Sequence, residues 1–161
     1  MKSKLVPALL ICALALSGCG KKDESVAAPA ASASATLTVE MTANDSMKFN
    51  ILRIEARAGQ EVKVILTNMG NMPKAAMGHN WVLLKAGTDA KAFIDAAVTA
   101  AATDYIPAAM ADSVLAHTKM LGPKQSDEVT FKAPTEPGEY AFVCSFPAHY
   151  LSGMHGVLVV K

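Results

Sequence analysis

Hydrophobic and polar residues alternate in short segments through most of the chain after residue 36. The alternation is clearest in QEVKVILT at 60–67, where every second residue from Val62 to Leu66 is apolar. A period of two is typical of half-buried β-strands, and turn-forming Gly, Pro and Asn residues separate the segments. The predicted strands are 37–41, 49–54, 60–67, 80–85, 127–132, 139–143 and 157–161. Together they predict an all-β, antiparallel sandwich.

One segment between these strands follows a helical period instead. Its apolar residues recur three and four positions apart, and they are Ala90, Phe93, Ile94, Ala97, Val98 and Ala101. Thr88 or Asp89 can cap the start of a helix, and Pro107 opposes its continuation. The sequence therefore predicts one helix near 89–102, inserted between strands.

The N-terminus has the pattern of an export signal. Lys2 and Lys4 precede an apolar run, residues 5–16, which is too short for a permanent transmembrane helix. Small residues then precede Cys19, which resembles the lipobox where bacterial lipoproteins are cleaved and acylated. We expect a signal peptide over 1–18 and lipid on Cys19; the alternative is an ordinary signal peptide and an unmodified cysteine.

Lipid chains on Cys19 would hold the protein on a membrane of the bacterial cell envelope, facing the periplasm. Gly20 favours the outer membrane over the inner one, because it does not resemble an inner-membrane retention signal. The residues after it, 20–35, are small, polar and interrupted by proline, as in flexible linkers. We assign 19–36 to the lipidated cysteine and linker, and 37–161 to one folded domain.

Charge excludes one class of partner. The 161 residues carry a net charge of +1, which becomes −1 when Lys2 and Lys4 leave with the signal peptide. No basic stripe is present in the sequence to neutralise phosphates, so nucleic acid is not an expected partner.

The three cysteines have different expected fates. Cys12 lies in the signal peptide and Cys19 at the lipidation position, which leaves Cys144 alone in the domain. An unpaired thiol in an exported protein is open to oxidation, so it needs protection by burial or by a metal. Cys144 begins the stretch CSFPAHYLSGMHG, which also contains His149 and Met154.

With His79 from the upstream stretch MGHNWVL, these residues supply the ligand types of a blue-copper electron-transfer site. A thiolate stabilises Cu(II), a thioether favours Cu(I), and a stiff sandwich can hold a geometry between the two preferences. A structural zinc site or a binuclear copper site usually needs a second cysteine. A Cys–His nucleophile pair would leave Met154 unexplained. Spacing alone leaves these alternatives open.

Five blocks resemble azurin-type blue copper proteins, in order over roughly 37–161. They are NDSMKFN at 44–50, GNMPK at 70–74, MGHNWVL at 77–83, AHTKMLG at 116–122 and CSFPAH followed by a methionine at 144–154. The resemblance implies an eight-stranded Greek-key cupredoxin β-sandwich with one mononuclear copper. It also implies that His79, Cys144 and His149 are trigonal ligands, Met154 a long axial ligand and the Gly78 carbonyl a weaker opposite contact.

The sequence departs from azurin in three places. Four residues separate His149 from Met154, where azurin has three; the interval matches plastocyanin and auracyanin and leaves the axial distance open. No cysteine stands near Leu37 or 58–59, where azurin has a disulfide, a crosslink typically worth about 2–4 kcal/mol. Asn68 replaces an azurin histidine, so pH-linked behaviour tied to that histidine is not expected.

The resemblance also implies roles around the ligands. We expect Asn80 to hydrogen-bond toward Cys144 and Ser145, and the backbone N–H of Phe146 to point at the Cys144 sulfur. We expect an apolar patch around the edge of His149 to dock partners transiently. Its residues are Met47, Met72, Met77, Phe146, Pro147, Ala148 and Leu151.

The other histidines and the tryptophan are expected to be structural. We place His117 at the surface or the end of the sandwich, His155 pointing away from the ligands because it directly follows Met154, and Trp81 in the core.

The resulting hypothesis is a membrane-tethered one-electron carrier that uses one copper per chain and shuttles electrons between redox proteins as a monomer. It is not expected to be an enzyme, because protein groups take every coordination position. The alternatives are a periplasmic copper-binding chaperone or storage protein, and a zinc-loaded structural module.

Overall fold

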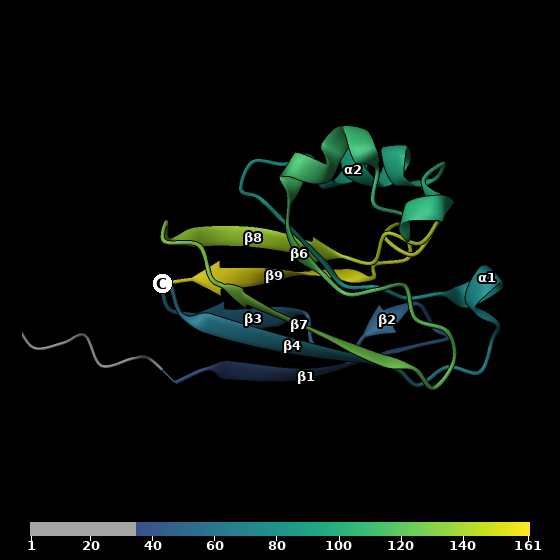
Figure 1. Cartoon of the computed structure of the whole chain (residues 1–161), viewed down its shortest axis with the longest axis horizontal. Helices are drawn as coiled ribbons and strands as arrows, with labels where there is room; N and C mark the ends of the chain where they lie inside the picture. The colour runs from purple at the N-terminus through teal and green to yellow at the C-terminus, as the bar shows by residue number, and fades with distance from the viewer. Residues whose placement is uncertain (1–34) are drawn as a thin grey trace, which may run out of the picture. The chain divides into compact units, whose positions relative to one another are not determined.

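Two β-sheets face each other in the computed structural model, which describes residues 35–161 (Figure 1). The predicted signal peptide, Cys19 and most of the predicted linker lie outside the described residues. Ala35 and Thr36 are described: the Ala35 carbonyl accepts from Gln60 Nε2 at 2.9 Å, and the Thr36 hydroxyl donates to Glu61 at 2.6 Å. Among residues 35–161, no helix is long and apolar enough to cross a membrane.

The first sheet has the strand order β2-β1-β4-β7. Its strands are β1 (Leu37–Asn44), β2 (Lys48–Phe49), β4 (Glu61–Asn68) and β7 (Ser126–Lys132). In β4 the predicted alternation is realised, since Val62, Val64 and Leu66 are fully buried between partly or fully exposed neighbours. Burial of each such side chain contributes about 1.5–3 kcal/mol, which fixes the face that this sheet turns toward the core.

The second sheet has the order β3-β9-β8-β5-β6. Its strands are β3 (Arg53–Ala56), β5 (Val82–Leu84), β6 (Val114–His117), β8 (Gly138–Val143) and β9 (His155–Val160). The prediction of purely antiparallel sheets is wrong, because β1 pairs with β4 and β3 with β9 in parallel. Chain segments that cross between the two sheets join each parallel pair, so neither pair needs a hairpin.

The single strand predicted over 49–54 is divided between the sheets. β2 pairs with β1, the chain turns at 50–52, and β3 then pairs with β9. Gly156 makes room for this crossing, because a Cβ there would clash with the Leu52 backbone oxygen. Counted as one interrupted strand, β2 and β3 bring the described strands to the eight that the cupredoxin resemblance implies.

The segment between β5 and β6 holds the predicted helix, but the helix is shorter than expected. Helix α2 (Ala90–Ala97) starts at Asp89, whose carboxylate accepts from the Ala92 N–H at 3.1 Å. Its buried Phe93 and Ile94 pack on Val82, Leu84 and Val143 of the second sheet. Two 3₁₀ segments follow, η1 (Ala101–Thr103) and η2 (Ala108–Ser113). Strand β6 and the one-turn helix α1 (Lys74–Met77) were not predicted.

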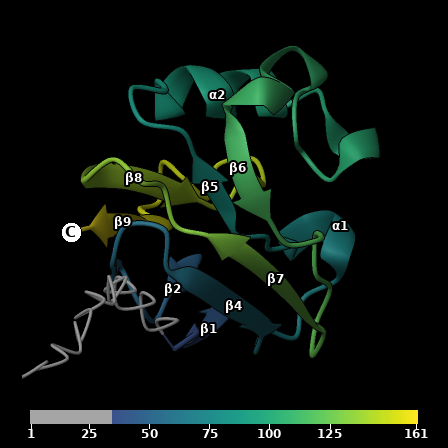
Figure 2. The same ribbon diagram turned by 60° about the vertical axis from the view of Figure 1, so that its left-hand side comes forward.

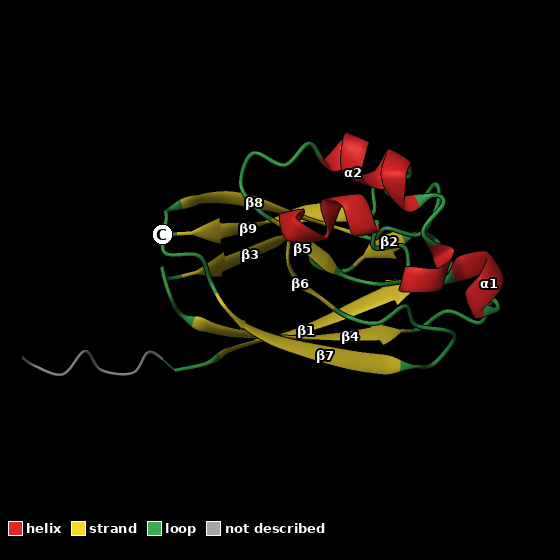
Figure 3. Ribbon diagram, turned by 45° about the horizontal axis from the view of Figure 1, so that its top comes forward, coloured by secondary structure: helices red, strands yellow, loops and turns green. Residues whose placement is uncertain are grey.

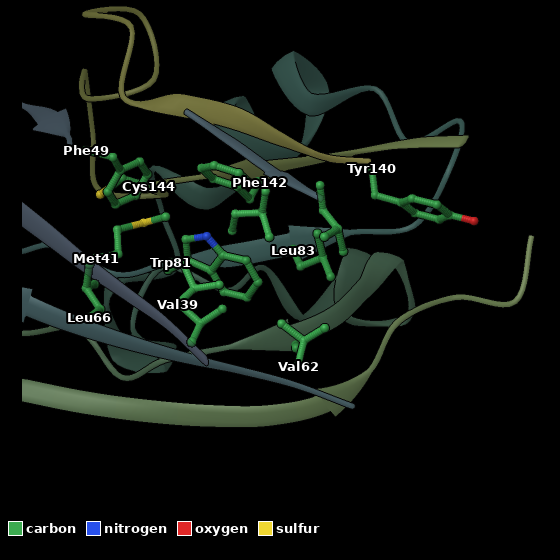
Figure 4. Packing of buried hydrophobic residues seen from close by; sticks show 14 of the residues in the cluster. Val39, Met41, Phe49, Val62, Leu66, Trp81, Leu83, Tyr140, Phe142 and Cys144 are labelled. Atoms are coloured by element: carbon green, nitrogen blue, oxygen red, sulfur yellow. The ribbon is translucent and has the colours of Figure 1, made fainter. Parts of the chain in front are cut away.

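The core lies between the sheets and reaches one end of the sandwich. Trp81 and Phe142 pack with ring centroids 5.7 Å apart, and Phe49 meets Phe142 at 5.8 Å. Cys144 stands at one end of the packed cluster and Tyr140 at the other (Figure 4). Helix α1 lies at the end of the sandwich away from the C-terminus (Figures 1, 2 and 3).

Candidate metal centre

Two separate segments bring three potential ligands together. His79 lies between α1 and β5 and forms an isolated bridge with Leu121: His79 N–H donates to the Leu121 carbonyl at 3.1 Å, and Leu121 N–H donates back at 2.8 Å. Cys144 directly follows β8, and His149 lies in the loop that leads to β9. Two strand ends of the sandwich therefore position all three side chains.

The three side chains form a compact, buried group. One ligand atom from each of His79, Cys144 and His149 lies within 4.8 Å of the others. Cys144 Sγ is 3.4 Å from His149 Nδ1, and the two imidazole centroids are 4.8 Å apart. None of the three is more than 1% exposed, so the group forms without contact to bulk water.

Burial keeps all three groups uncharged in the metal-free protein. It raises the pKa of the Cys144 thiol to about 12, although backbone N–H groups of Asn80 and Phe146 oppose this by bonding to the sulfur. Burial lowers the pKa of His79 to about 4, an effect that the Asp45 charge and the Asn44 backbone partly offset. Burial, and then the neighbouring His79, lowers the pKa of His149 to about 4.

This donor set fits a metal cation. Both ring nitrogens of His79 are buried and lack a hydrogen-bond partner among residues 35–161, and buried polar atoms rarely stay unpaired in folded proteins. Neutral imidazoles are ready to ligate, and a thiol gives up its proton when it binds a cation despite a high pKa in the free state. One thiolate with two imidazoles suits copper or zinc.

The family model for copper-binding proteins of the plastocyanin/azurin family matches residues 35–161. The chain belongs to this family. Azurin of Achromobacter denitrificans is 38% identical to the chain over 125 residues, which are 76% of this chain and 82% of that azurin. Outer membrane protein H.8 of Neisseria meningitidis serogroup B is 42% identical over 114 residues; the match covers 70% of this chain and 60% of that protein.

Solved structures agree with the sequence comparison. Dithionite-reduced auracyanin from Roseiflexus castenholzii superposes with a TM-score of 0.69 at 35% identity, over 77% of this chain and 96% of that one. The cupredoxin fold and the family resemblance inferred from sequence are confirmed. So is the prediction that His79, Cys144 and His149 of this blue copper protein meet in one potential copper site.

Asn80 connects the two halves of this cupredoxin site. Its Oδ1 accepts from the Ser145 N–H at 2.8 Å, and its Nδ2 donates to the Ser145 hydroxyl at 2.8 Å and to the Asp104 carbonyl at 3.1 Å. Because Asn80 follows His79 and Ser145 follows Cys144, these bonds fix one ligand relative to the other. The Phe146 ring packs against His149 at a tilt of 40°, with centroids 4.7 Å apart.

The remaining two predicted ligands lie beside the group. Met154 is fully buried, and its carbonyl accepts from the Cys144 N–H at 3.1 Å, which closes the ligand loop. Gly78 has no room for a side chain, since a Cβ there would lie 2.8 Å from the Lys74 carbonyl and 2.9 Å from Met120 Sδ. Axial coordination by Met154 and a carbonyl contact from Gly78 stay predictions.

The predicted docking patch varies in exposure. Leu151 is 74% exposed and Met72 41%, Ala148 is exposed, and Met47, Met77 and Pro147 are half-buried. Phe146 is only 8% exposed, because it packs between Tyr105 and His149.

The other histidines and Trp81 lie apart from the three-residue group. His117 on β6 is exposed, as is His155, whose ring stacks on Tyr150 with centroids 4.8 Å apart. Trp81 is fully buried in the core cluster.

Two acidic residues near the site were missed by the sequence reasoning. The Asp45 carboxylate accepts from the Asn71 N–H at 2.8 Å and so joins the loops that carry Met47 and Met72. Asp104 accepts from the Met120 N–H at 3.1 Å and lies 3.5 Å from Lys74 Nζ, in addition to its bond with Asn80. Asp45 stands within NDSMKFN, but only the fold reveals its partners.

Proposed function

We propose that this cupredoxin carries single electrons between redox proteins through one copper held by His79, Cys144 and His149. Met154 would add its thioether to this ligand set, and Gly78 would add its backbone carbonyl. The observation that carries the proposal is the buried ligand group, in which one ligand atom from each residue lies within 4.8 Å of the others.

Copper bound there supplies a couple between Cu(I) and Cu(II) that accepts or releases one electron. The protein's contribution is to hold the ligand side chains in place when the charge of the copper changes. The Asn80–Ser145 bonds, the Leu121–His79 bridge and the Cys144–Met154 bond restrain the ligand segments from separate sides. With every position taken by protein, no place stays open for a substrate, so the proposed role is transfer and not catalysis.

Redox partners are proposed to bind at the docking patch around His149. The Phe146 ring packs on this imidazole, and exposed Leu151, Ala148 and Met72 offer apolar surface to a redox protein. Small apolar interfaces suit weak encounters that must end quickly. Methionine side chains adapt to more than one partner surface.

The protein is further proposed to work as a monomer on the bacterial cell envelope, held by lipid on Cys19 and facing the periplasm. The lipobox-like sequence supports this anchor, and so does the similarity to outer membrane protein H.8. A carrier confined to a membrane surface would meet membrane-bound partners at a raised effective concentration.

The test is a copper titration of the purified protein followed by visible spectroscopy and voltammetry. A carrier gives an intense thiolate-to-copper band at one equivalent and a reversible one-electron wave with the metal retained. A chaperone or store instead passes its copper readily to an apo acceptor protein, which would refute the carrier role. A protein that binds only zinc, without the visible band, would reduce the site to a structural module.

A further inference from the structure

The longer interval between His149 and Met154 is folded as overlapping hydrogen-bonded turns. Ser152 N–H donates to the Ala148 carbonyl at 3.0 Å, Gly153 N–H to Tyr150 at 2.9 Å and Met154 N–H to His149 at 3.0 Å. The Ser152 carbonyl accepts none of these turn hydrogen bonds and needs a partner from elsewhere.

Lys48 supplies that partner from the other sheet. Its Nζ donates to the backbone carbonyl of Ser152, 104 positions away in the sequence. Lys48 lies in β2, where it pairs with Asn44 of β1 in the first sheet, whereas the strand that follows Met154 belongs to the second sheet. The contact therefore fastens the ligand loop across the open end of the sandwich.

Gly153 leaves space for this contact. Its φ of +89° is a conformation that side-chain-bearing residues rarely adopt, and a Cβ there would lie 2.8 Å from Lys48 Nζ. An alanine at this position would strain the turn and displace the ammonium group.

We propose that Lys48 is a positioning residue that holds the end of the ligand loop and so sets the place of Met154 relative to Cys144 and His149. The loop is closed from inside by the Cys144–Met154 hydrogen bond and from outside by Lys48. Its effect on copper rests on the proposed function, but the restraint on the loop does not.

The first experiment follows amide hydrogen exchange in the metal-free, full-length protein. In Lys48→Met the aliphatic stem is kept and the donor is lost, so the amides of 152–154 should exchange about three- to tenfold faster. Lys48→Arg keeps a charged donor and should restore the slow exchange. The matched control is Lys63→Met, which removes an ammonium 2.7 Å from Glu128 on the first sheet, remote from the ligand loop. Equal exchange at 152–154 in wild type and Lys48→Met would overturn the proposal, whatever the site binds.

The second experiment records visible and electron paramagnetic resonance spectra of the Cu(II) forms, which report ligand geometry. Lys48→Met should change the relative band intensities, while Lys48→Arg and Lys63→Met should match wild type. Faster exchange with an unchanged spectrum would show that Lys48 restrains the loop without placing Met154, which overturns the positioning role. Absence of a blue spectrum in wild type would refute the proposed function and leave the exchange result to decide the restraint.

A double-mutant cycle with Gly153→Ala tests whether both changes act through one contact. If they do, Lys48→Met should add little to the faster exchange already caused by Gly153→Ala. Fully additive effects would contradict a shared contact.

Discussion

Replacing Asn80 by alanine should loosen the connection between the two segments that carry the ligands. The Asn80 side chain makes three hydrogen bonds, two of them to Ser145 at 2.8 Å and one to the Asp104 carbonyl at 3.1 Å. Asn80 and Ser145 are both almost completely buried, so water cannot readily replace the lost bonds. The substitution leaves the N–H and the hydroxyl of Ser145 without their partner.

The expected loss of stability follows from those two groups. An unsatisfied polar group inside a protein costs about 1–3 kcal/mol, so with two such groups Asn80→Ala should lower the free energy of unfolding by about 2–6 kcal/mol. That is a large share of the roughly 5–15 kcal/mol by which domains are usually stable.

Urea unfolding of the metal-free protein measures this loss without a contribution from metal binding. Asn50→Ala is the matched control, because Asn50 is exposed and its Oδ1 accepts a single bond, from the Thr42 N–H at 2.7 Å. The control should lose less than about 1 kcal/mol. The reasoning fails if Asn80→Ala is no less stable than Asn50→Ala, or if its Cu(II) spectrum equals that of wild type.

Three further predictions concern acid stability, docking and anchoring. The metal-free domain should lose stability as the pH falls from about 6.5 toward 4, because histidines of the unfolded chain take up protons before folded His79 and His149, whose pKa values are about 4. The loss of unfolding free energy is at most about 3 kcal/mol for each histidine. Urea midpoints that stay constant across this pH range would contradict the prediction. Met77→Lys should slow the second-order reaction with a redox partner, because it adds charge to the docking patch. Lys85→Met, outside the patch, is the control. An unchanged rate for Met77→Lys would reject the docking patch. Cys19→Ala should move the protein from the membrane to the soluble fraction with the same visible spectrum, and unchanged fractionation would exclude an anchor on Cys19.

The sequence pattern predicted β4, whose alternation matches its burial, and it missed β6, whose apolar residues do not mark its buried positions. In β4 every second side chain is buried, so a period of two is visible in the residue types. In β6 only Ala116 is buried and Leu115 is 37% exposed, so its residue types carry no such signal. That strand forms because β5 offers a partner, which is a property of the fold.

Helix α2 ends earlier than its composition indicates for a similar reason. Val98 continues the helical spacing and the alanines after it favour helix, yet Val98 is 52% exposed and the helix ends at Ala97. Asp104 and Tyr105 then adopt positive φ angles of 53° and 60°. This turn brings the Asp104 carbonyl to Asn80 and its carboxylate to Met120, contacts that no local pattern could reveal.

Within the metal centre, too, some features could be predicted from the sequence and others could not. Cys144, His149, Met154 and His79 were found from sequence because few residue types bind copper, so the chemistry itself marks the candidates. The Asn80–Ser145 bonds were expected from the family resemblance, whereas the Lys48–Ser152 contact joins residues 104 positions apart and was not predicted. If Met154 binds copper as predicted, its distance from the metal would depend on such a contact as well as on the ligand residues. In this chain Lys48 is where we expect such an effect to arise, since it fastens the one interval in which the loop departs from azurin.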